Sequence, residues 1–191
     1  MIGLFGGSFD PIHLGHLLVA QAVVEALELE ELRFVPARLQ PFKVGQHRAP
    51  AEARAAMVEL AIRGEPRFRL ERCELEREGP SYTVDTLREL GGREPGREFA
   101  LVVGADAAAE LPSWREGSDI PGLARIVAFA RAGRAAPVAP YVWRTVEVPA
   151  IGISSTEIRA RVRAGWSIRY WVPEAVAEYV AARRLYLDGD E

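Results

Sequence analysis

The chain has 191 residues, of which 49% are hydrophobic and 27% are charged, and its formal net charge is −3. This length fits one domain with an ample core, and the small net charge gives no general attraction to nucleic acid or anionic membranes. Cys73 is the only cysteine, which excludes an intrachain disulfide and a cysteine-based zinc cluster. The sequence has no apolar run of 18 residues and no basic segment at its start. We therefore expect no transmembrane helix, no signal peptide and a cytoplasmic location.

Short apolar runs alternate with helix-forming segments along the chain. We expect strands at 2–5, 32–35, 68–71, 98–103, 126–130 and 146–148, and helices at 14–28, 50–63, 83–90, 154–164 and 173–184. Gly91-Gly92 predicts the end of the 83–90 helix, and a short helix is expected before Leu111. This alternation predicts an α/β fold with a doubly wound parallel sheet, helices on both faces and a short C-terminal helical segment.

We expect residues 1–187 to form a single domain, with 154–187 as its C-terminal helical part and 188–191 as an acidic tail. Ligands of doubly wound sheets bind at the carboxyl ends of the strands. Four segments of interest fall there, namely 6–16, the polar loop 37–49, 104–114 and the turn before Ser154. Loop 37–49 is predicted to be mobile.

The first of these segments is Gly6-Gly7-Ser8-Phe9-Asp10-Pro11-Ile12-His13-Leu14-Gly15-His16. Its glycines predict a turn that can aim backbone N–H groups and a helix N-terminus at a phosphate. His13 and His16 would project from the first turn of the helix, where they can donate hydrogen bonds to that phosphate. Without nearby carboxylates the pair is a poor metal site.

Three later features each allow a structural and a functional interpretation. Ser154 and Glu157 have the spacing of a capping box, and the same helix start could also offer free N–H groups and Arg159 to phosphates. Asp106 could cap a helix or accept hydrogen bonds from ribose hydroxyls. Trp114 could fill the core or stack on a pyridine ring.

These segments together resemble the nucleotidyltransferase superfamily and, within it, the bacterial nicotinate-nucleotide adenylyltransferases. The His-x-Gly-His pattern is shared with class I aminoacyl-tRNA synthetases, and the resemblance covers nearly the full chain. The further motifs that carry it are Ser81-Tyr82-Thr83-Val84-Asp85-Thr86-Leu87, Gly104-Ala105-Asp106, Leu111-Pro112-Ser113-Trp114, Ile153-Ser154-Ser155-Thr156-Glu157-Ile158-Arg159 and Tyr170-Trp171-Val172-Pro173.

The resemblance implies a Rossmann-like fold and transfer of the adenylyl group of ATP to nicotinate mononucleotide. The products are nicotinate adenine dinucleotide (deamido-NAD) and pyrophosphate, in NAD biosynthesis. Catalytic roles are implied for His13, His16 and Arg159. ATP binding is implied for Gly6, Gly7, Phe9, His13, His16, Gly104, Asp106, Ile153, Ser154, Ser155 and Arg159. Nicotinate mononucleotide binding is implied for Ser8, Lys43, Tyr82, Thr83, Asp106, Trp114 and Arg131.

The residues fit the physical needs of this reaction. The nucleophile is a phosphate already ionised at neutral pH, so catalysis requires alignment and charge stabilisation rather than a general base. The sequence has no acidic cluster suited to metal ions, and we expect Mg²⁺ to be held mainly by the ATP phosphates. Gln40-Pro41-Phe42-Lys43 departs from the family's frequent Pro-Pro-His-Lys, and Arg131-Ala132-Gly133 departs from its Arg-Pro-Gly. Lys43 and Arg131 are kept, whereas the loop histidine is lost.

Four other classes of protein share part of this pattern. A sister transferase with another acceptor, such as pantetheine phosphate, is disfavoured by the Thr83 segment and by Leu-Pro-x-Trp. A class I synthetase needs more chain, and a dehydrogenase needs a Gly-x-Gly-x-x-Gly turn. A non-catalytic nucleotide sensor would be favoured by loss of either motif histidine or of Arg159, and all three are present. We expect no nucleic-acid or membrane partner, and a homo-oligomer stays open.

Overall fold

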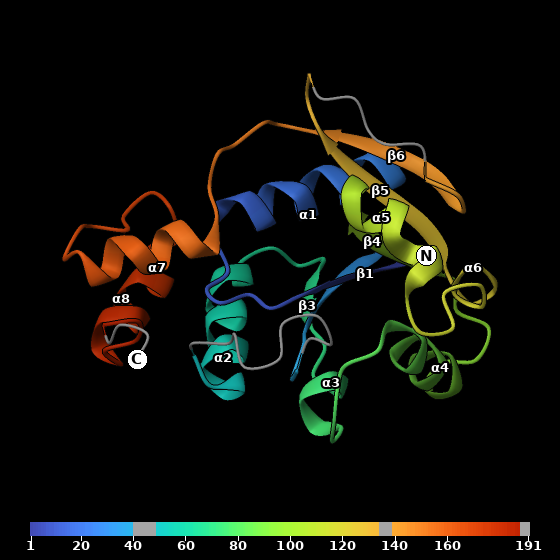
Figure 1. The fold of residues 1–191 in the computed structure, drawn as a ribbon, viewed down its shortest axis with the longest axis horizontal. Helices are drawn as coiled ribbons and strands as arrows, with labels where there is room; N and C mark the ends of the chain where they lie inside the picture. Colours follow the sequence, from blue (N-terminus) through green and yellow to red (C-terminus); the bar gives the residue numbers. More distant parts are fainter. Residues whose placement is uncertain (40–48, 134–138, 188–191) are drawn as a thin grey trace.

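The computed structural model describes residues 1–39, 49–133 and 139–187, and these form one parallel sheet covered by helices (Figure 1). The strands are β1 (Ile2–Gly7), β2 (Glu31–Pro36), β3 (Phe68–Leu70), β4 (Phe99–Gly104), β5 (Arg125–Arg131) and β6 (Val142–Val148). They lie in the order β3-β2-β1-β4-β5-β6, and every neighbouring pair is parallel. The order reverses between β1 and β4, as in a doubly wound sheet. The predicted Rossmann-like α/β fold is confirmed.

The helices divide between the two faces of the sheet. They are α1 (Leu14–Leu27), α2 (Ala51–Ile62), α3 (Cys73–Glu76), α4 (Thr83–Arg93), α5 (Ala105–Glu110), the 3-10 helix η1 (Leu111–Ser113), α6 (Ile120–Leu123), α7 (Ser155–Arg163) and α8 (Glu174–Ala182). One buried cluster contains side chains of α1, α2, α7 and α8, and the other contains side chains of α3, α4, α5 and α6. Both faces are therefore covered.

Strand β4 shows why this segment is a strand buried on both sides. Phe99, Leu101 and Val103 belong to the α4 side of the core, whereas Ala100 and Val102 belong to the α1 side. Successive side chains of a strand point to opposite faces, so an unbroken apolar run fits a central strand between two helical layers. Because all strands run the same way, their carboxyl ends share one edge of the sheet.

Some boundaries differ from the sequence-based expectation. Helix α4 continues through Gly91 and Gly92 to Arg93, and the left-handed glycine comes later, at Gly96 with φ of 84°. The short helices α3 and α6 were not expected, and β6 begins at Val142 rather than at Val146. Within the described residues, no helix is long and apolar enough to cross a membrane.

Candidate active site

A cavity of about 770 Å³ opens at the carboxyl edge of the sheet, between the N-terminal ends of α1 and α7. Its walls come from residues within 5–19 and 148–159, together with Phe129 and Arg131. We call it the histidine cavity, because His13 and His16 both line it. Two segments that are far apart in the sequence thus form the walls of one cavity.

The two imidazoles are held in a fixed arrangement. His13 is the N-cap residue of α1, and its backbone N–H donates to Nδ1 of His16 at 3.2 Å. The rings stack with centroids 3.7 Å apart and planes 23° apart. Because Nδ1 of His16 accepts a hydrogen bond, the neutral ring carries its proton on Nε2. His16 is therefore prepared to donate a hydrogen bond from Nε2.

The pKa values of both histidines lie below the usual value. Burial, and secondly the charge of Arg131, lower the pKa of His13 to about 4. Burial, and secondly His13, hold the pKa of His16 well below the usual 6.5. Nδ1 of His13 is buried and has no hydrogen-bond partner among the described residues. The pair therefore offers hydrogen-bonding groups, rather than standing positive charge, to an anion.

Two glycines of the motif lie in crowded surroundings, where a side chain would force a neighbouring ring to shift. A Cβ atom on Gly15 would lie 3.0 Å from Nδ1 of His13, and one on Gly7 would lie 3.0 Å from the Phe9 ring. Gly6 has open space around its Cα. The turn starts later than predicted, because Gly6 and Gly7 are the last residues of β1. The left-handed residue of the turn is Phe9, with φ of 48°.

Helix α7 docks directly on this turn. The Ser154 hydroxyl accepts from the backbone N–H of Glu157 at 3.2 Å, which is the Ser154 half of the predicted capping box. The Ser155 hydroxyl donates to the carbonyl of Pro11 at 2.9 Å, and the Arg159 guanidinium donates to the carbonyl of Asp10 at 2.8 Å. The cap uses one N–H of the helix start, so others stay available to an anion in the cavity.

A second cavity, of about 480 Å³, lies on the other side of β1. We call it the tryptophan cavity, because Trp114 lines it together with Tyr82, Thr83 and Asp106. Gly7 lines both cavities. The two hollows thus meet at the last residue of β1, where groups bound in each would face one another.

Asp106 is not the helix cap that one interpretation of the sequence suggested. Gly104 is the N-cap of α5, and Asp106 lies exposed in the first turn. Its carboxylate is therefore open to hydroxyl groups in the tryptophan cavity. Trp114 is half-buried, with one part packed against the core and another part on the cavity. Its packing and its place in the site are compatible.

The structure distributes the predicted site residues somewhat differently from the two implied sets. Ser8 and Arg131, expected with the mononucleotide, line the histidine cavity. Gly6, expected with ATP, lines the tryptophan cavity. Phe9, Ile153, Ser154, Ser155 and Arg159 line the histidine cavity as the ATP set implies. Lys43 lies outside the described residues.

Glu74, Glu110 and Arg115 line the tryptophan cavity and were not singled out from the sequence. They follow no short motif, because they come from α3, α5 and the segment after η1. In the described part of the chain, no three His, Cys, Asp or Glu side chains cluster in a way that could hold a metal ion.

The chain is similar to known proteins in its family model, its sequence and its fold. Residues 4–161 match the cytidylyltransferase-like family model. A probable nicotinate-nucleotide adenylyltransferase of Thermus thermophilus is 51% identical over 185 residues, which cover 97% of this chain and 98% of that protein. One of Geobacillus kaustophilus is 46% identical over 185 residues, covering 97% and 85% of the two chains.

A similar fold occurs in the Plasmodium falciparum nicotinic acid mononucleotide adenylyltransferase complexed with NaAD. The TM-score is 0.79 at 21% sequence identity, and the match covers 97% of this chain and 96% of that one. The Vibrio parahaemolyticus structure of a putative nicotinate-nucleotide adenylyltransferase gives a TM-score of 0.72 at 17% identity, covering 98% and 96%. At these identities the likeness concerns the fold.

Proposed function

The chain belongs to the nicotinate-nucleotide adenylyltransferase family, and we propose that ATP binds in its histidine cavity and nicotinate mononucleotide in its tryptophan cavity. The observation that supports this division is the shared wall at Gly7. An adenylyl transfer needs two anions brought end to end at one point, and two cavities meeting at a strand end provide that arrangement. The larger cavity, with His13, His16 and Arg159, suits the triphosphate.

The proposed chemistry is an in-line displacement at the α-phosphate of ATP. A phosphate oxygen of the mononucleotide forms the new P–O bond, the bond between the α- and β-phosphates breaks, and pyrophosphate leaves with the electron pair. The nucleophile is ionised at neutral pH, so none of the described residues is required as a base. The hydrogen-bond donors of His16 and Arg159 and the free N–H groups of α7 stabilise charge on the phosphates.

Helix α4 supplies the groups that we propose for recognition of the nicotinate ring. Its first turn begins at Thr83 beside the tryptophan cavity, and its first N–H groups lack partners within the helix. Such N–H groups bind a ring carboxylate better than an amide, because an amide presents a donor where an acceptor is wanted. Trp114 would stack on the ring. These contacts favour the acid over the amide.

We further propose that magnesium arrives with ATP, held by phosphate oxygens and water, because the described residues offer it no ready ligand set. Bound there, the ion would neutralise phosphate charge. A cytoplasmic location fits the single cysteine, which is free and buried. We propose that ATP and nicotinate mononucleotide are its partners, with no nucleic acid or membrane among them.

The direct experiment mixes the purified protein with ATP, magnesium and nicotinate mononucleotide and measures pyrophosphate. We expect release that depends on both substrates and is faster than with nicotinamide mononucleotide. Trp114→Ala should raise the KM for the mononucleotide more than the KM for ATP. No release above background would refute the activity, and equal effects on the two KM values would refute the assignment of the cavities.

A further inference from the structure

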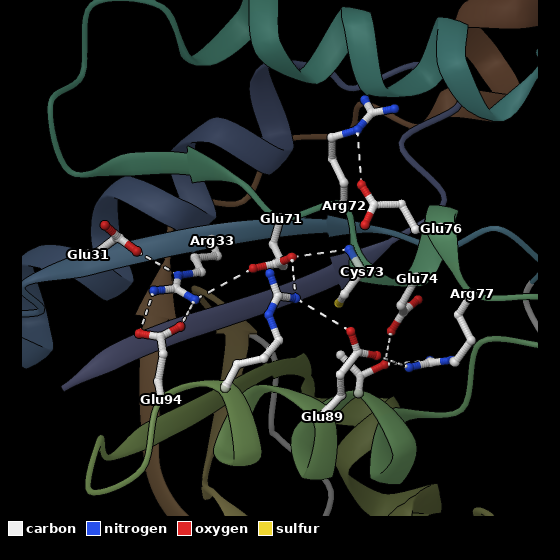
Figure 2. A network of polar contacts seen from close by, with 12 residues as sticks. Glu31, Arg33, Glu71, Arg72, Cys73, Glu74, Glu76, Arg77, Glu89 and Glu94 are labelled. Atoms are coloured by element: carbon white, nitrogen blue, oxygen red, sulfur yellow. Dashed lines mark hydrogen bonds and ion pairs between the residues drawn. The ribbon is translucent and has the colours of Figure 1, made fainter.

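A network of charged side chains joins β2, α3 and α4 (Figure 2), and its member Glu74 also lines the tryptophan cavity. At one end Arg33 pairs with Glu31 at 2.6 Å and also with Glu94. Arg33 lies 3.5 Å from Glu71, which in turn lies 3.3 Å from Arg93. These contacts bind the far part of α4 to the sheet.

The other end of the network centres on a buried hydroxyl. Oγ1 of Thr86 donates to Oε1 of Glu74 at 2.7 Å and accepts from the Arg77 guanidinium at 2.8 Å. Glu74 is 8% exposed and Thr86 is 4% exposed. Burial raises the pKa of Glu74, against the opposing effects of the Thr86 hydrogen bond and the Arg77 charge. Arg77 also pairs with Glu89 at 2.9 Å.

This end of the network is connected to the cavity wall. Thr86 lies one helical turn after Tyr82, and its backbone N–H donates to the Tyr82 carbonyl at 3.2 Å. The Thr86 hydroxyl lies 3.3 Å from the same carbonyl. Tyr82 is the N-cap of α4 and Thr83 is its first residue, and both line the tryptophan cavity. Thr86 is therefore in direct contact with the residue at which the helix starts.

We propose that Glu74 is a positioning residue for nicotinate mononucleotide. Acting through Thr86, it holds the first turn of α4 where Tyr82 and Thr83 meet the substrate. A buried carboxyl group that accepts from Thr86 beside a substrate cavity fixes geometry there more strongly than packing alone, because an unmade bond would leave a desolvated polar group. The inference rests on the proposed binding of the mononucleotide in this cavity.

The test compares two substitutions at the same position. Glu74→Ala removes the acceptor of the Thr86 hydrogen bond, and loss of one such bond corresponds to a rise on the order of tenfold in the KM for nicotinate mononucleotide. The KM for ATP should change less than about twofold, since ATP occupies the other cavity. Glu74→Gln keeps an acceptor of the same shape and should restore most of the affinity. Thr86→Val and Thr86→Ser form a second pair with the same logic.

Glu94→Gln is the matched control, because it weakens the Arg33 end of the same network and Glu94 is not among the residues that line the tryptophan cavity. It should lower stability and leave both KM values unchanged. An equal rise of the two KM values in Glu74→Ala, or a Glu74→Gln variant as impaired as Glu74→Ala, would overturn the positioning role. Failure of both Glu74→Ala and Thr86→Val to fold would assign the network to stability alone, which also overturns it.

The failure of this inference can be told apart from that of the proposed function. A wild-type protein without pyrophosphate release, or a Trp114→Ala variant with unchanged mononucleotide KM, removes the premise. An active wild type with the expected Trp114→Ala effect but normal kinetics in Glu74→Ala leaves the function in place and refutes only the role of Glu74.

Discussion

His13 makes the stability of the fold depend on pH in a defined direction. Burial and Arg131 lower its pKa to about 4, whereas an unfolded histidine has a pKa of about 6.5. Between these values the unfolded chain binds the proton and the folded chain does not, so stability falls as the pH falls through this window. The resulting loss in free energy of unfolding at low pH reaches about 3 kcal/mol at most.

His13→Asn should remove this dependence, since asparagine keeps an N-cap but does not titrate. We expect the difference in free energy of unfolding between the wild type and the variant to shrink or reverse as the pH is lowered from 7 to 4.5. Urea denaturation at several pH values measures it, and subtraction cancels the carboxylates common to both proteins. If the difference between the two proteins stays constant with pH, His13 takes up its proton in the folded state as readily as in the unfolded chain, and its pKa is not lowered.

For individual residues, the sequence predicted that His13 and His16 lie together at the start of a helix, but it did not predict their tautomers or pKa values. The spacing of His13 and His16 placed both on the first turn of a helix, and the structure confirms that placement. The stacking and the His16 tautomer come from contacts within three residues, whereas the low pKa of His13 depends on burial and on the charge of Arg131, which lies far along the chain. No local pattern carries that information.

At the scale of one element, substitutions at the N-terminus of α7 can distinguish capping of the helix from binding of ATP. Ser154→Ala removes the hydroxyl that accepts from Glu157, which should cost about 1 kcal/mol of stability while leaving turnover nearly unchanged. Ser154→Asp keeps a cap and suits the helix dipole, yet it adds a negative charge to the histidine cavity. It should raise the KM for ATP on the order of tenfold or more.

Ser154→Asn is the matched neutral control, because it caps the helix without the charge. Thermal unfolding and steady-state kinetics on the three variants give the comparison. If Ser154→Asp and Ser154→Asn have the same KM for ATP, the triphosphate does not lie near this helix start.

Element boundaries show where local signals fail. Gly91 and Gly92 favour a helix end, each costing about 1 kcal/mol relative to alanine in a helix. The helix nevertheless continues to Arg93, whose side chain pairs with Glu71 on the neighbouring segment. Tertiary contacts thus outweigh the local preference. The four-residue helices α3 and α6 are too short for a periodic pattern, so the sequence could not predict them.

At the scale of the whole molecule, the alternation of strands and helices predicted a parallel sheet but not the order of its strands. The order places the end of β1 beside both β2 and β4 and so creates two cavities at Gly7. The C-terminal segment then closes the fold against the N-terminal motif. That contact joins residues far apart in sequence and was beyond any reasoning from spacing.

Tyr186 links the C-terminal segment to the N-terminal motif. Its hydroxyl donates to Oδ1 of Asp10 at 2.7 Å, and its side chain is 7% exposed. Tyr186→Phe keeps the ring and loses the bond, so the free energy of unfolding should fall by about 1–2 kcal/mol. Because the Asp10 carbonyl holds Arg159 in the histidine cavity, the KM for ATP should also rise, with the mononucleotide KM unchanged.

Tyr179→Phe serves as the control, since Tyr179 lies on the same C-terminal part with its ring against Arg183 rather than against the motif. Chemical denaturation and steady-state kinetics on both variants distinguish two cases. A coupled loss of stability and ATP affinity only in Tyr186→Phe means that the C-terminal segment sets the geometry of the phosphate site. A loss of stability with unchanged KM for ATP would mean that Arg159 keeps its place without help from the chain end, and that α7 alone is sufficient to hold it.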